Sequence, residues 1–533
     1  MHTFLHKFAP LLCGILMGFD RVIFRGSLRN LSYPAGLQHY LWANRVPFKD
    51  FAAHSEDVTE RLLAASERQA KESGREIRYL PCSSANKEDI ARHIAARDDI
   101  RDGLICVLRC VEPCMSFQIH KSRVSRRLEI KYRQRQCLHL YHYQQHPVFG
   151  FMHVRLQTWF PFRVQVYING REWLGRQMDQ AGITYQRRDN CFPWVADLAR
   201  AQALLDEQTR LTWSSVLDEL TMAAHPLHPE IFAKYPTRYY WSVFQSEWAT
   251  DVMFRRRSDL QALYHRWIRH GITSYGAADV MRFLGHRLSW CGYVPAAFAG
   301  EVVSDVQGRQ EGVRIKHSVN GNSLKMYDKG SVLRVETTIN APEEFRVYRH
   351  KEGQTEGDKT CLPLRHGVAD IACRAEVSQA ANERYLEATA AITEQRPLRQ
   401  LAEPLCQAAV APRGPTQTTA TASARRRVRP LNPFAPKDAA LLEAVSRPEF
   451  VQNGLRNRDI CRLLYATAPR TVAQRRQRSA CVTRHLRLLR GHGVLKKVPK
   501  THRYLFTEQG RIVVTALLAA RNASVDYLTS KAG

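Results

Sequence analysis

The stretch from Glu311 to Asn340 carries two tight-turn signals, which constrain the fold more than any other feature of the chain. Asn320-Gly321 is a preferred pair for a two-residue hairpin turn, and Lys329-Gly330 supplies a second turn. Three antiparallel strands are therefore expected. With the second turn centred on Lys329-Gly330, Lys325 would lie directly opposite Arg334.

Alternation of side chains along each strand divides this meander into two faces. The apolar face, which also carries His317, consists of Val313, Ile315, Leu324, Met326, Leu333 and Val335. The polar face consists of Arg314, Lys316, Lys325, Tyr327, Arg334 and Glu336. Because the apolar set needs a core, the polar set should face solvent or a ligand. Opposed cations cost up to about 1 kcal/mol, and a bound anion would relieve that cost.

Two interpretations of the polar face stay open. It is either a solvated network of ion pairs, which adds little stability, or a platform for a phosphate backbone. In the second interpretation Tyr327 is a nucleophile and Glu336 is an acid/base or a metal ligand, with Lys325 and Arg334 completing the catalytic set.

The balance of charge indicates the class of partner. The chain of 533 residues has a formal net charge of +29 and a pI of about 9.9. This excess argues for a polyanion, with DNA as the first choice and RNA as an alternative. The length suggests about three domains. The apolar run from Leu11 to Phe19 is too short to span a bilayer, so we expect a core segment, no membrane partner and a cytoplasmic location.

Cysteine spacing argues against a zinc site. The thirteen cysteines are scattered, and Cys106, Cys110 and Cys114 lie four residues apart rather than in CxxC pairs. We expect mostly buried thiols in a reducing compartment.

The order of helix, strand and linker signals predicts an α+β multi-domain protein. The expected parts are a mixed α/β domain at 1–200, a helical region at 201–300, a β-meander with helices at 301–407, a basic linker at 408–431 and a C-terminal module at 432–533. The meander is expected to pack with the N-terminal part. Within that part, Phe117 to Leu140 is predicted to form a basic hairpin.

Residues 432–533 show helix and strand signals in a distinctive order. Helices are expected over 438–445, 454–465 and 478–490, with Asn457 and Ser479 as N-caps. Strands over 494–498 and 503–507 then flank a Pro-Lys-Thr-His segment, and a helix over 509–521 closes the module. This order resembles the winged-helix domains of MarR-type repressors.

The resemblance implies that the third helix enters the major groove and that the basic wing contacts the backbone or minor groove. By matching position, the readers would be Ser479, Thr483, Arg484 and Arg487, with Lys500 and His502 on the wing. Further DNA contacts would come from Arg490, Lys496, Lys497 and Arg503.

Charge over the same stretch agrees with that role. From Arg456 to Arg503 the chain has fourteen Lys and Arg against one acid, Asp459. If six of these cations met phosphates, affinity would fall roughly 10³-fold between 50 and 200 mM salt. Many winged helices are dimers, so a homodimer is considered as well.

A second resemblance lies in the meander. Asn322 to Lys329, followed by Leu333 to Glu336, resembles a stretch of the rolling-circle replication initiators of plasmids and filamentous phages. That family nicks one DNA strand through a tyrosine with a divalent metal, which implies the same chemistry here. The family's His-hydrophobic-His metal motif has no counterpart, and the nearest substitutes are His139, His142 and His153.

A third pattern supports an alternative enzyme. Asp20 on the first expected strand, Glu112 at the end of a later strand and Asp370 at the start of a helix resemble the acids of RNase H/RuvC-type nucleases. That resemblance implies two metal ions, Mg or Mn, held by acids from separate elements.

Together these patterns predict a nucleic-acid-binding protein of the kind that mobile elements or plasmids use for replication initiation or transposition. The winged helix would anchor it on DNA, and strand nicking would require a divalent metal. The alternatives are a non-enzymatic winged-helix regulator, an RNase H-like metal nuclease and an RNA-binding protein.

Overall fold

The computed structural model describes residues 1–309, 312–350, 359–392, 398–410, 427–499 and 501–524. The chain divides into two compact units. The sheet unit comprises Phe8–Leu260 and Gly321–Glu383, and the terminal unit comprises Met1–Lys7, Gln261–Asn320 and Arg384–Gly533. Helices accompany a large mixed sheet and several small ones, so the expected α+β multi-domain class is confirmed.

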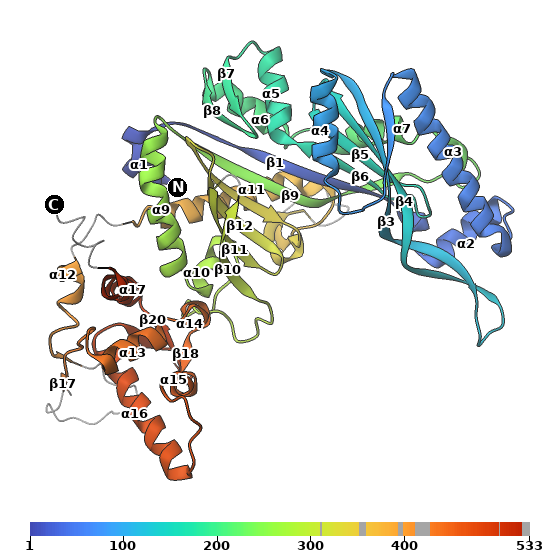
Figure 1. Ribbon diagram of the computed structural model, residues 1–533. Coiled ribbons are helices and arrows are strands. Elements are labelled where there is room, and N and C mark those ends of the chain that lie inside the picture. Colours follow the sequence, from blue (N-terminus) through green and yellow to red (C-terminus); the bar gives the residue numbers. More distant parts are fainter. Residues whose placement is uncertain (310–311, 351–358, 393–397, 411–426, 500, 525–533) are drawn as a thin grey trace. The chain divides into compact units, whose positions relative to one another are not determined.

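In the sheet unit, neighbouring strands come from distant parts of the chain, in the order β12-β13-β9-β1-β6-β5-β4-β3-β2 (Figure 1). The pairs are antiparallel except β2 and β3, which run parallel. The strands are β1 (Leu12–Leu28), β2 (Glu76–Leu80), β3 (Gly103–Lys121), β4 (Leu128–His146), β5 (Gly150–Gln157), β6 (Val164–Asn169), β9 (Tyr239–Phe254), β12 (Asn322–Asp328) and β13 (Val332–Ile339).

Helices and two small hairpins surround this sheet. The helices are α2 (Pro34–Ala43), α3 (Phe51–Glu72), α4 (Lys87–Arg97), α5 (Gly170–Gln180), α6 (Leu198–Glu207), α7 (Trp213–Ala224), α8 (His228–Ile231) and α11 (Ile371–Thr389). The hairpins are β7 (Tyr185–Arg188) with β8 (Cys191–Val195), and β14 (Arg346–Arg349) with β15 (Thr360–Pro363). The core between sheet and helices includes Phe24, Leu62, Val166, Trp213 and Val243, all buried.

Strand β1 confirms one expectation from the sequence, and strand β9 corrects another. The apolar run Leu11–Phe19 lies almost entirely in the core strand β1. Residues 201–300 are helical over α6, α7 and α8, but Tyr239–Phe254 forms β9 where a helix was expected. The reason is that the second half of β9, from Trp248 to Phe254, is buried on both faces, so its pattern does not alternate there. Earlier in the strand, Tyr240 and Phe244 are exposed.

The meander forms with the predicted faces but a different register. Lys325 lies opposite Glu336, and Tyr327 lies opposite Arg334. The predicted opposition of Lys325 and Arg334 is therefore wrong. The turn is centred on Gly330-Ser331, because the Asp328 carboxylate accepts a hydrogen bond of 2.6 Å from the Gly330 amide. A turn moved by one residue shifts each partner by two, which leaves every side chain on its predicted face.

One of the two predicted faces matches its expected burial at all but one apolar position. Ile315, Leu324, Met326, Leu333 and Val335 are buried, but Val313, expected on the same face, is 37% exposed. The polar face was expected to meet solvent or a ligand. Instead it is largely covered, because Arg334 and Glu336 are buried and bound to other side chains of the protein.

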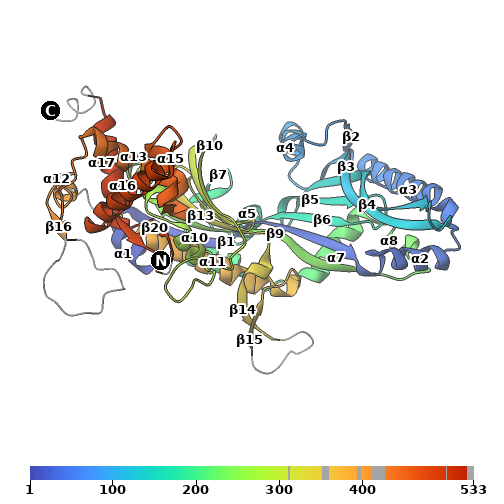
Figure 2. The same cartoon turned by 90° about the horizontal axis from the view of Figure 1, so that it is seen from below.

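The terminal unit contains a three-stranded sheet with the order β18-β20-β19. Elements α13, α15, α16, β19, β20 and α17 follow each other in the order predicted for the C-terminal module, and Figure 2 shows its helices grouped together. Their core includes Leu442, Ile460, Val482, Leu486 and Leu517. The bounds are α13 (Pro436–Val445), α14 (Pro448–Asn453), β18 (Leu455–Arg456), α15 (Asn457–Leu464), α16 (Val472–Gly491), β19 (Leu495–Lys497), β20 (Arg503–Phe506) and α17 (Glu508–Asn522).

The other elements of the terminal unit precede this module. They are α1 (His2–Phe8), α9 (Arg257–Thr273), α10 (Ala277–Phe283), β10 (Val302–Arg309), β11 (Gly312–Val319), α12 (Leu398–Ala402), β16 (Ala409–Val410) and β17 (Arg427–Val428). The expected linker 408–431 falls around the last two, and its residues 411–426 lie outside the described part of the chain.

Both N-caps predicted for this module are corrected. Helix α16 begins at Val472, and the Thr471 hydroxyl accepts from the Gln474 amide at 3.1 Å, so Ser479 lies inside the helix. The cap position of α15 is Arg456, one residue before Asn457. Asn457 instead joins the two helices, as described below.

Among the helices that the structure describes, none has both the length and the apolar character needed to cross a bilayer. All thirteen cysteines are unbridged. The expectation that most of them are buried is wrong, because four are buried, six are partly buried and three are exposed.

Candidate functional site

The polar face of β12 and β13 lies in a charge network within the sheet unit. Lys325 donates from Nζ to Glu336 Oε1 at 2.7 Å and to Glu247 Oε1 at 3.0 Å. Tyr327 donates from its hydroxyl to Glu336 Oε2 at 2.5 Å. The two carboxylates come from β13 and β9, so one ammonium group joins three neighbouring strands.

Arg334 forms the second half of this network. Its guanidinium makes two hydrogen bonds to Asp251, of 2.6 and 2.8 Å, and one of 2.7 Å to Asp20 Oδ1. It also donates to the backbone carbonyl of Asn190 at 2.6 Å. Asn190 lies in the β7–β8 turn and donates from Nδ2 to Asp20 at 2.6 Å. The turn therefore helps to close the network from above the sheet.

Asp20 reaches this face because strand β1 is irregular at that point. In the pairing with β9, Phe19 lies opposite Trp248 and Arg21 lies opposite Glu247, so Asp20 is an extra residue on β1. Such a bulge bends the strand and re-aims a side chain. Asp20 and the next residue, Arg21, consequently both approach the acids of β9.

The opposite face of the same strands is held by α11. Asn382 donates to the carbonyls of Trp248 and Val335, at 3.2 and 3.1 Å, and accepts from the Thr337 hydroxyl at 2.7 Å. These bonds fix the positions of β9 and β13 relative to each other. The charged side chains on the other face are thus carried by a rigid support.

Helix α5 brings a further cation. The Asn169 side chain accepts from the amides of Arg171 and Glu172 and so caps the helix. Arg171, which is fully buried, donates to Asp251 at 3.0 Å and to the Ala249 carbonyl at 3.2 Å. Its Nε and Nη1 have no hydrogen-bond partner in the described structure.

The network contains equal numbers of acids and cations, and most of these side chains are deeply buried. The acids are Asp20, Glu247, Asp251 and Glu336, and the cations are Arg21, Arg171, Lys325 and Arg334. Most of them are almost fully covered, while Arg21 is 51% exposed and both Lys325 and Glu247 are 13% exposed. The side of the network at Arg21 therefore faces solvent.

Three of these carboxylates are close enough to share a cation. One ligand atom from each of Asp20, Glu247 and Glu336 lies within 4.8 Å of the others. Carboxylate oxygens are the donors that Mg²⁺ and Mn²⁺ prefer, so the donor set fits such an ion. At present Lys325 Nζ lies between two of the three, and a metal would have to displace it.

The network shifts the pKa of its members in opposite directions. Burial alone would raise the pKa of Glu336, but the charges of Lys325 and Arg334, with hydrogen bonds from Lys325 and Tyr327, lower it to about 2. Burial and the neighbouring Glu336 charge raise the pKa of Glu247. Burial and the same charge raise the pKa of Tyr327 well above its ordinary value, so its phenol is protonated at neutral pH.

The structure brings the predicted residues together only in part. Tyr327, Glu336, Lys325 and Arg334 share one network, as the meander pattern suggested, and Asp20 joins them. Sequence reasoning missed Glu247, Asp251, Arg21, Arg171 and Asn190. The first two lie four residues apart, a spacing that puts them on one face of a strand. That signal was hidden because the segment was interpreted as a helix.

The alternative metal trio is not assembled. Glu112 is held by Lys87 at 2.9 Å, in a separate cluster. Asp370 pairs with Arg365 at 2.7 Å near the start of α11. Asp20 bonds to neither of them, so the expectation that these three acids share a metal is wrong. Each acid instead has a local cation that satisfies it.

The histidines named as substitutes for the missing metal motif, His139, His142 and His153, lie in surroundings that indicate a structural role. His142 Nε2 lies 3.1 Å from the Ser66 hydroxyl, and His153 stacks on Tyr167 with ring centroids 5.1 Å apart. Burial lowers the pKa of His139 and His142 to about 4 and that of His153 to about 3. Within the described residues, the only metal-compatible group found is the acidic one above.

The C-terminal module from α13 to α17 presents a separate surface. The exposed side chains among the predicted DNA contacts are Thr483, Arg484, Arg487, Lys496, Lys497, His502 and Arg503. Arg490 is partly buried, and Lys500 lies outside the described residues. The early start of α16 adds Arg475 and Arg476, both exposed, which the sequence interpretation did not include.

Two of the predicted readers also fix the geometry of the helix pair. Asn457 on α15 donates to the Ser479 carbonyl at 3.0 Å and to the Thr483 hydroxyl at 2.9 Å. The Ser479 hydroxyl donates back to Asn457 at 3.1 Å. Ser479 is therefore committed to holding α16 against α15, whereas Arg484 and Arg487 have no such bond in the described structure.

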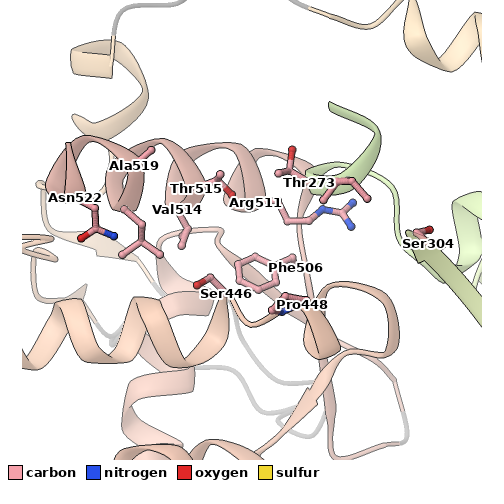
Figure 3. Close-up of a pocket in the computed structure, with 12 residues that line it drawn as sticks. Thr273, Ser304, Ser446, Pro448, Phe506, Arg511, Val514, Thr515, Ala519 and Asn522 are labelled. Carbon is pink, nitrogen blue, oxygen red and sulfur yellow. The ribbon is translucent and has the colours of Figure 1, made fainter. Parts of the chain in front are cut away.

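A cavity of about 460 Å³ lies beside α17 in the terminal unit (Figure 3). Its apolar wall includes Phe506, Val514 and Leu518, and Arg511 and Thr515 add polar atoms. This composition suits a small amphipathic ligand.

Comparison with family models, with curated proteins and with solved structures finds no match for this chain.

Proposed function

We propose that this chain is a DNA-binding protein that grips duplex DNA with α16 and the wing of its winged helix. The observation that carries the proposal is the exposed surface of Arg484, Arg487, Lys496, Lys497 and Arg503. Asp459, the one acid of this stretch, is partly buried and accepts from the Arg456 amide at 2.9 Å. It is therefore occupied in capping α15 and offsets little of that positive surface.

Physical reasoning divides the work between these side chains. A helix fits the major groove, where arginine can make two hydrogen bonds to guanine. Arg484 and Arg487 suit that role because they are exposed on α16, which is held in place by α15. Lys496, Lys497 and Arg503 suit phosphate contacts, which position a protein without reading sequence.

Fluorescence anisotropy with a labelled 40-base-pair duplex tests this function. The double variant Arg484→Ala/Arg487→Ala is expected to lose specific affinity by at least tenfold, at roughly 1–3 kcal/mol for each base contact. Arg447→Ala is the matched control, because Arg447 is an exposed arginine of the same module paired with Glu449. A wild-type chain that binds no duplex at low salt would contradict the proposal.

Strand nicking at the charge network is the second candidate function. The observation that favours it is the 2.5 Å hydrogen bond from Tyr327 to Glu336, within reach for a base that activates a nucleophile. In the proposed step the Tyr327 oxygen bonds to phosphorus as the bond to a deoxyribose oxygen breaks. Glu336 takes the phenolic proton, and the released alkoxide takes a proton from water.

A divalent ion held by Asp20, Glu247 and Glu336 would supply Lewis-acid stabilisation of the phosphate charge. Mg or Mn fits this donor set, as the nicking resemblance implies. The two chemistries separate by mutation. Tyr327→Phe abolishes nicking and the covalent protein–DNA adduct if the tyrosine is the nucleophile, but it leaves cleavage by a metal-activated water intact. Glu247→Gln removes a metal ligand and impairs both chemistries.

A non-enzymatic regulator is the remaining candidate, and the cavity beside α17 favours it. This alternative expects no cleavage with Mg or Mn and full operator binding by residues 430–533 alone. Competition between single-stranded RNA and duplex DNA at equal salt tests the RNA-binding alternative. The proposed setting is a cytoplasmic protein of a mobile element or plasmid, acting on DNA as a monomer or homodimer.

A further inference from the structure

The hairpin of β3 and β4 is longer than the sheet to which it belongs. Strand β2 pairs with β3 only over Cys106–Cys110, and β5 pairs with β4 only over His139–His146. Residues 111–138 pair only with each other, in register to Lys121 opposite Leu128. Figure 1 shows this two-stranded ribbon extending beyond the other strands of the unit.

The base of the ribbon is anchored to the sheet unit. Phe117 is fully buried, with its ring 4.8 Å from that of Tyr132. Its carbonyl accepts from Trp159 at 3.2 Å, and the Ser116 hydroxyl donates to the Phe160 carbonyl at 2.9 Å. Ile119 and Ile130, the next apolar pair along the ribbon, are partly buried against the same core. The distal part, residues 120–129, therefore projects from a fixed base. We call this part the β3–β4 arm.

The arm and the strand that follows it carry dense positive charge. Six of the cations there are exposed: Lys121, Arg123, Arg126, Arg127, Lys131 and Arg133. In the described part of the chain, none of these six lies within 4 Å of a carboxylate as an ion pair. Cations that lie close together without carboxylate partners repel each other and do not stabilise the fold. The cluster therefore indicates a polyanionic partner.

The single acid of the arm, Glu129, is exposed but bonded within the tip. Glu129 accepts from the Ser125 hydroxyl at 2.6 Å, across the tip of the hairpin. The tip is closed by a hydrogen bond of 2.9 Å from the Ser122 amide to the Arg127 carbonyl. Arg126 takes a positive φ of 58°, which completes the turn. Glu129 thus orders the tip rather than pairing with its arginines.

An apolar residue lies at the very end of the arm. Val124 is 97% exposed, and Leu128 is 41% exposed. Proteins that enter DNA grooves use such apolar side chains against bases and sugars, between cations that hold the phosphates. A two-stranded ribbon also fits the major groove, which is about 12 Å wide.

We propose that the β3–β4 arm is a second DNA-binding element, which lies in the major groove of duplex DNA. The arginines of the tip contact the phosphates on either side, and Val124 contacts the groove floor. The inference rests on the proposed DNA-binding function but uses a different part of the chain. An acidic protein or a single-stranded nucleic acid would be bound by charge alone and would make no contact with Val124.

The experiment compares three full-length variants with the wild type by anisotropy on a 40-base-pair duplex between 50 and 300 mM KCl. The arm variant is Arg123→Gln/Arg126→Gln/Arg127→Gln. The charge-matched control is Arg68→Gln/Arg97→Gln/Arg101→Gln, three exposed arginines of the same unit. The third variant, Val124→Asp, adds a carboxylate at a position too exposed to affect folding.

If the arm binds phosphates, the slope of log K against log salt falls by about 0.9 for each lost contact, or about 2 to 3 in all, in the arm variant. The control keeps the wild-type slope, and Val124→Asp weakens duplex binding at least tenfold. An arm variant that binds duplex like the wild type overturns the inference, as does a loss confined to single strands. A wild type that binds no duplex instead refutes the proposed function itself.

Discussion

Arg334 on β13 and Asp251 on β9 face each other through two hydrogen bonds, of 2.6 and 2.8 Å, with both side chains buried. Asp20 shares the same guanidinium at 2.7 Å. Removing one partner of a buried ion pair leaves a charge without compensation, which typically costs about 3–5 kcal/mol. Arg334 is therefore expected to be essential for the stability of the sheet unit, whatever its role in chemistry.

The first prediction follows for Arg334→Met. We expect the free energy of unfolding to fall by about 3–5 kcal/mol, because two buried carboxylates lose their shared cation. Urea unfolding followed by tryptophan fluorescence measures this change. Arg21→Met is the control: that side chain is 51% exposed and 3.6 Å from its acids, so about 1 kcal/mol or less is expected. Equal losses in the two variants would contradict the prediction.

A second prediction concerns Lys325, whose ammonium lies between Glu247 and Glu336. Lys325→Met removes that positive charge and leaves the three-carboxylate group open to a divalent ion. We expect millimolar Mg²⁺ or Mn²⁺ to raise the melting temperature of the variant more than that of the wild type, by mass action on the folded state.

The double variant Lys325→Met/Glu247→Gln is the control for that measurement. It keeps the open space but loses one of the three carboxylates, so the metal-dependent gain in melting temperature should disappear. A gain that persists in the double variant would show that the ion binds somewhere else.

Much of this network could be predicted from the sequence, and there is a physical reason why the rest could not. Alternation along β12 and β13 placed Lys325, Tyr327, Arg334 and Glu336 on one face, because a strand has a period of two whatever the register. The register itself depended on one hydrogen bond, from the Gly330 amide to Asp328. Turn propensities of the individual residues do not take that hydrogen bond into account.

The partners supplied by distant strands were beyond local reasoning. Asp20 and Arg334 are separated by 314 residues, and only the strand order of the sheet brings them together. Strand β9 was misassigned because its second half, from Trp248 to Phe254, is buried on both faces, which removes the alternation that identifies a half-buried strand. The order of helices and strands in the C-terminal module was predictable because its contacts are local: these elements follow one another within about 100 residues. Its N-caps were not, because α16 begins at Val472, several residues before the predicted start.

A third prediction uses the low pKa of Glu336, about 2, against an unfolded value of about 4.3. A depressed carboxyl pKa contributes stability above the unfolded pKa, and that contribution is lost as the pH falls toward the folded pKa. Glu336→Gln should therefore be less stable than the wild type at pH 6, and the gap should narrow by about 1 kcal/mol at pH 3.5. Urea unfolding at the two pH values measures the gap, and a constant gap would contradict the assignment.

The last prediction concerns His225, which is fully buried and has no hydrogen-bond partner for either ring nitrogen in the described structure. Burial, with smaller contributions from His228 and His142, lowers its pKa to about 3. The unfolded chain takes up a proton below about pH 6.5, whereas the folded chain does not. Folding is therefore penalised as the pH falls from 6.5, by about 2 kcal/mol at pH 5.

His225→Phe removes that penalty. Its ring lies 6.1 Å from Phe162, so a phenyl group has an aromatic neighbour there. Extra volume changes stability equally at every pH, so the informative quantity is the difference between pH 8 and pH 5. We expect the variant to lose about 2 kcal/mol less than the wild type over that interval. His93→Gln, at an exposed position, should lose as much as the wild type, and a His225→Phe chain that did the same would show that this imidazole takes up its proton without unfolding.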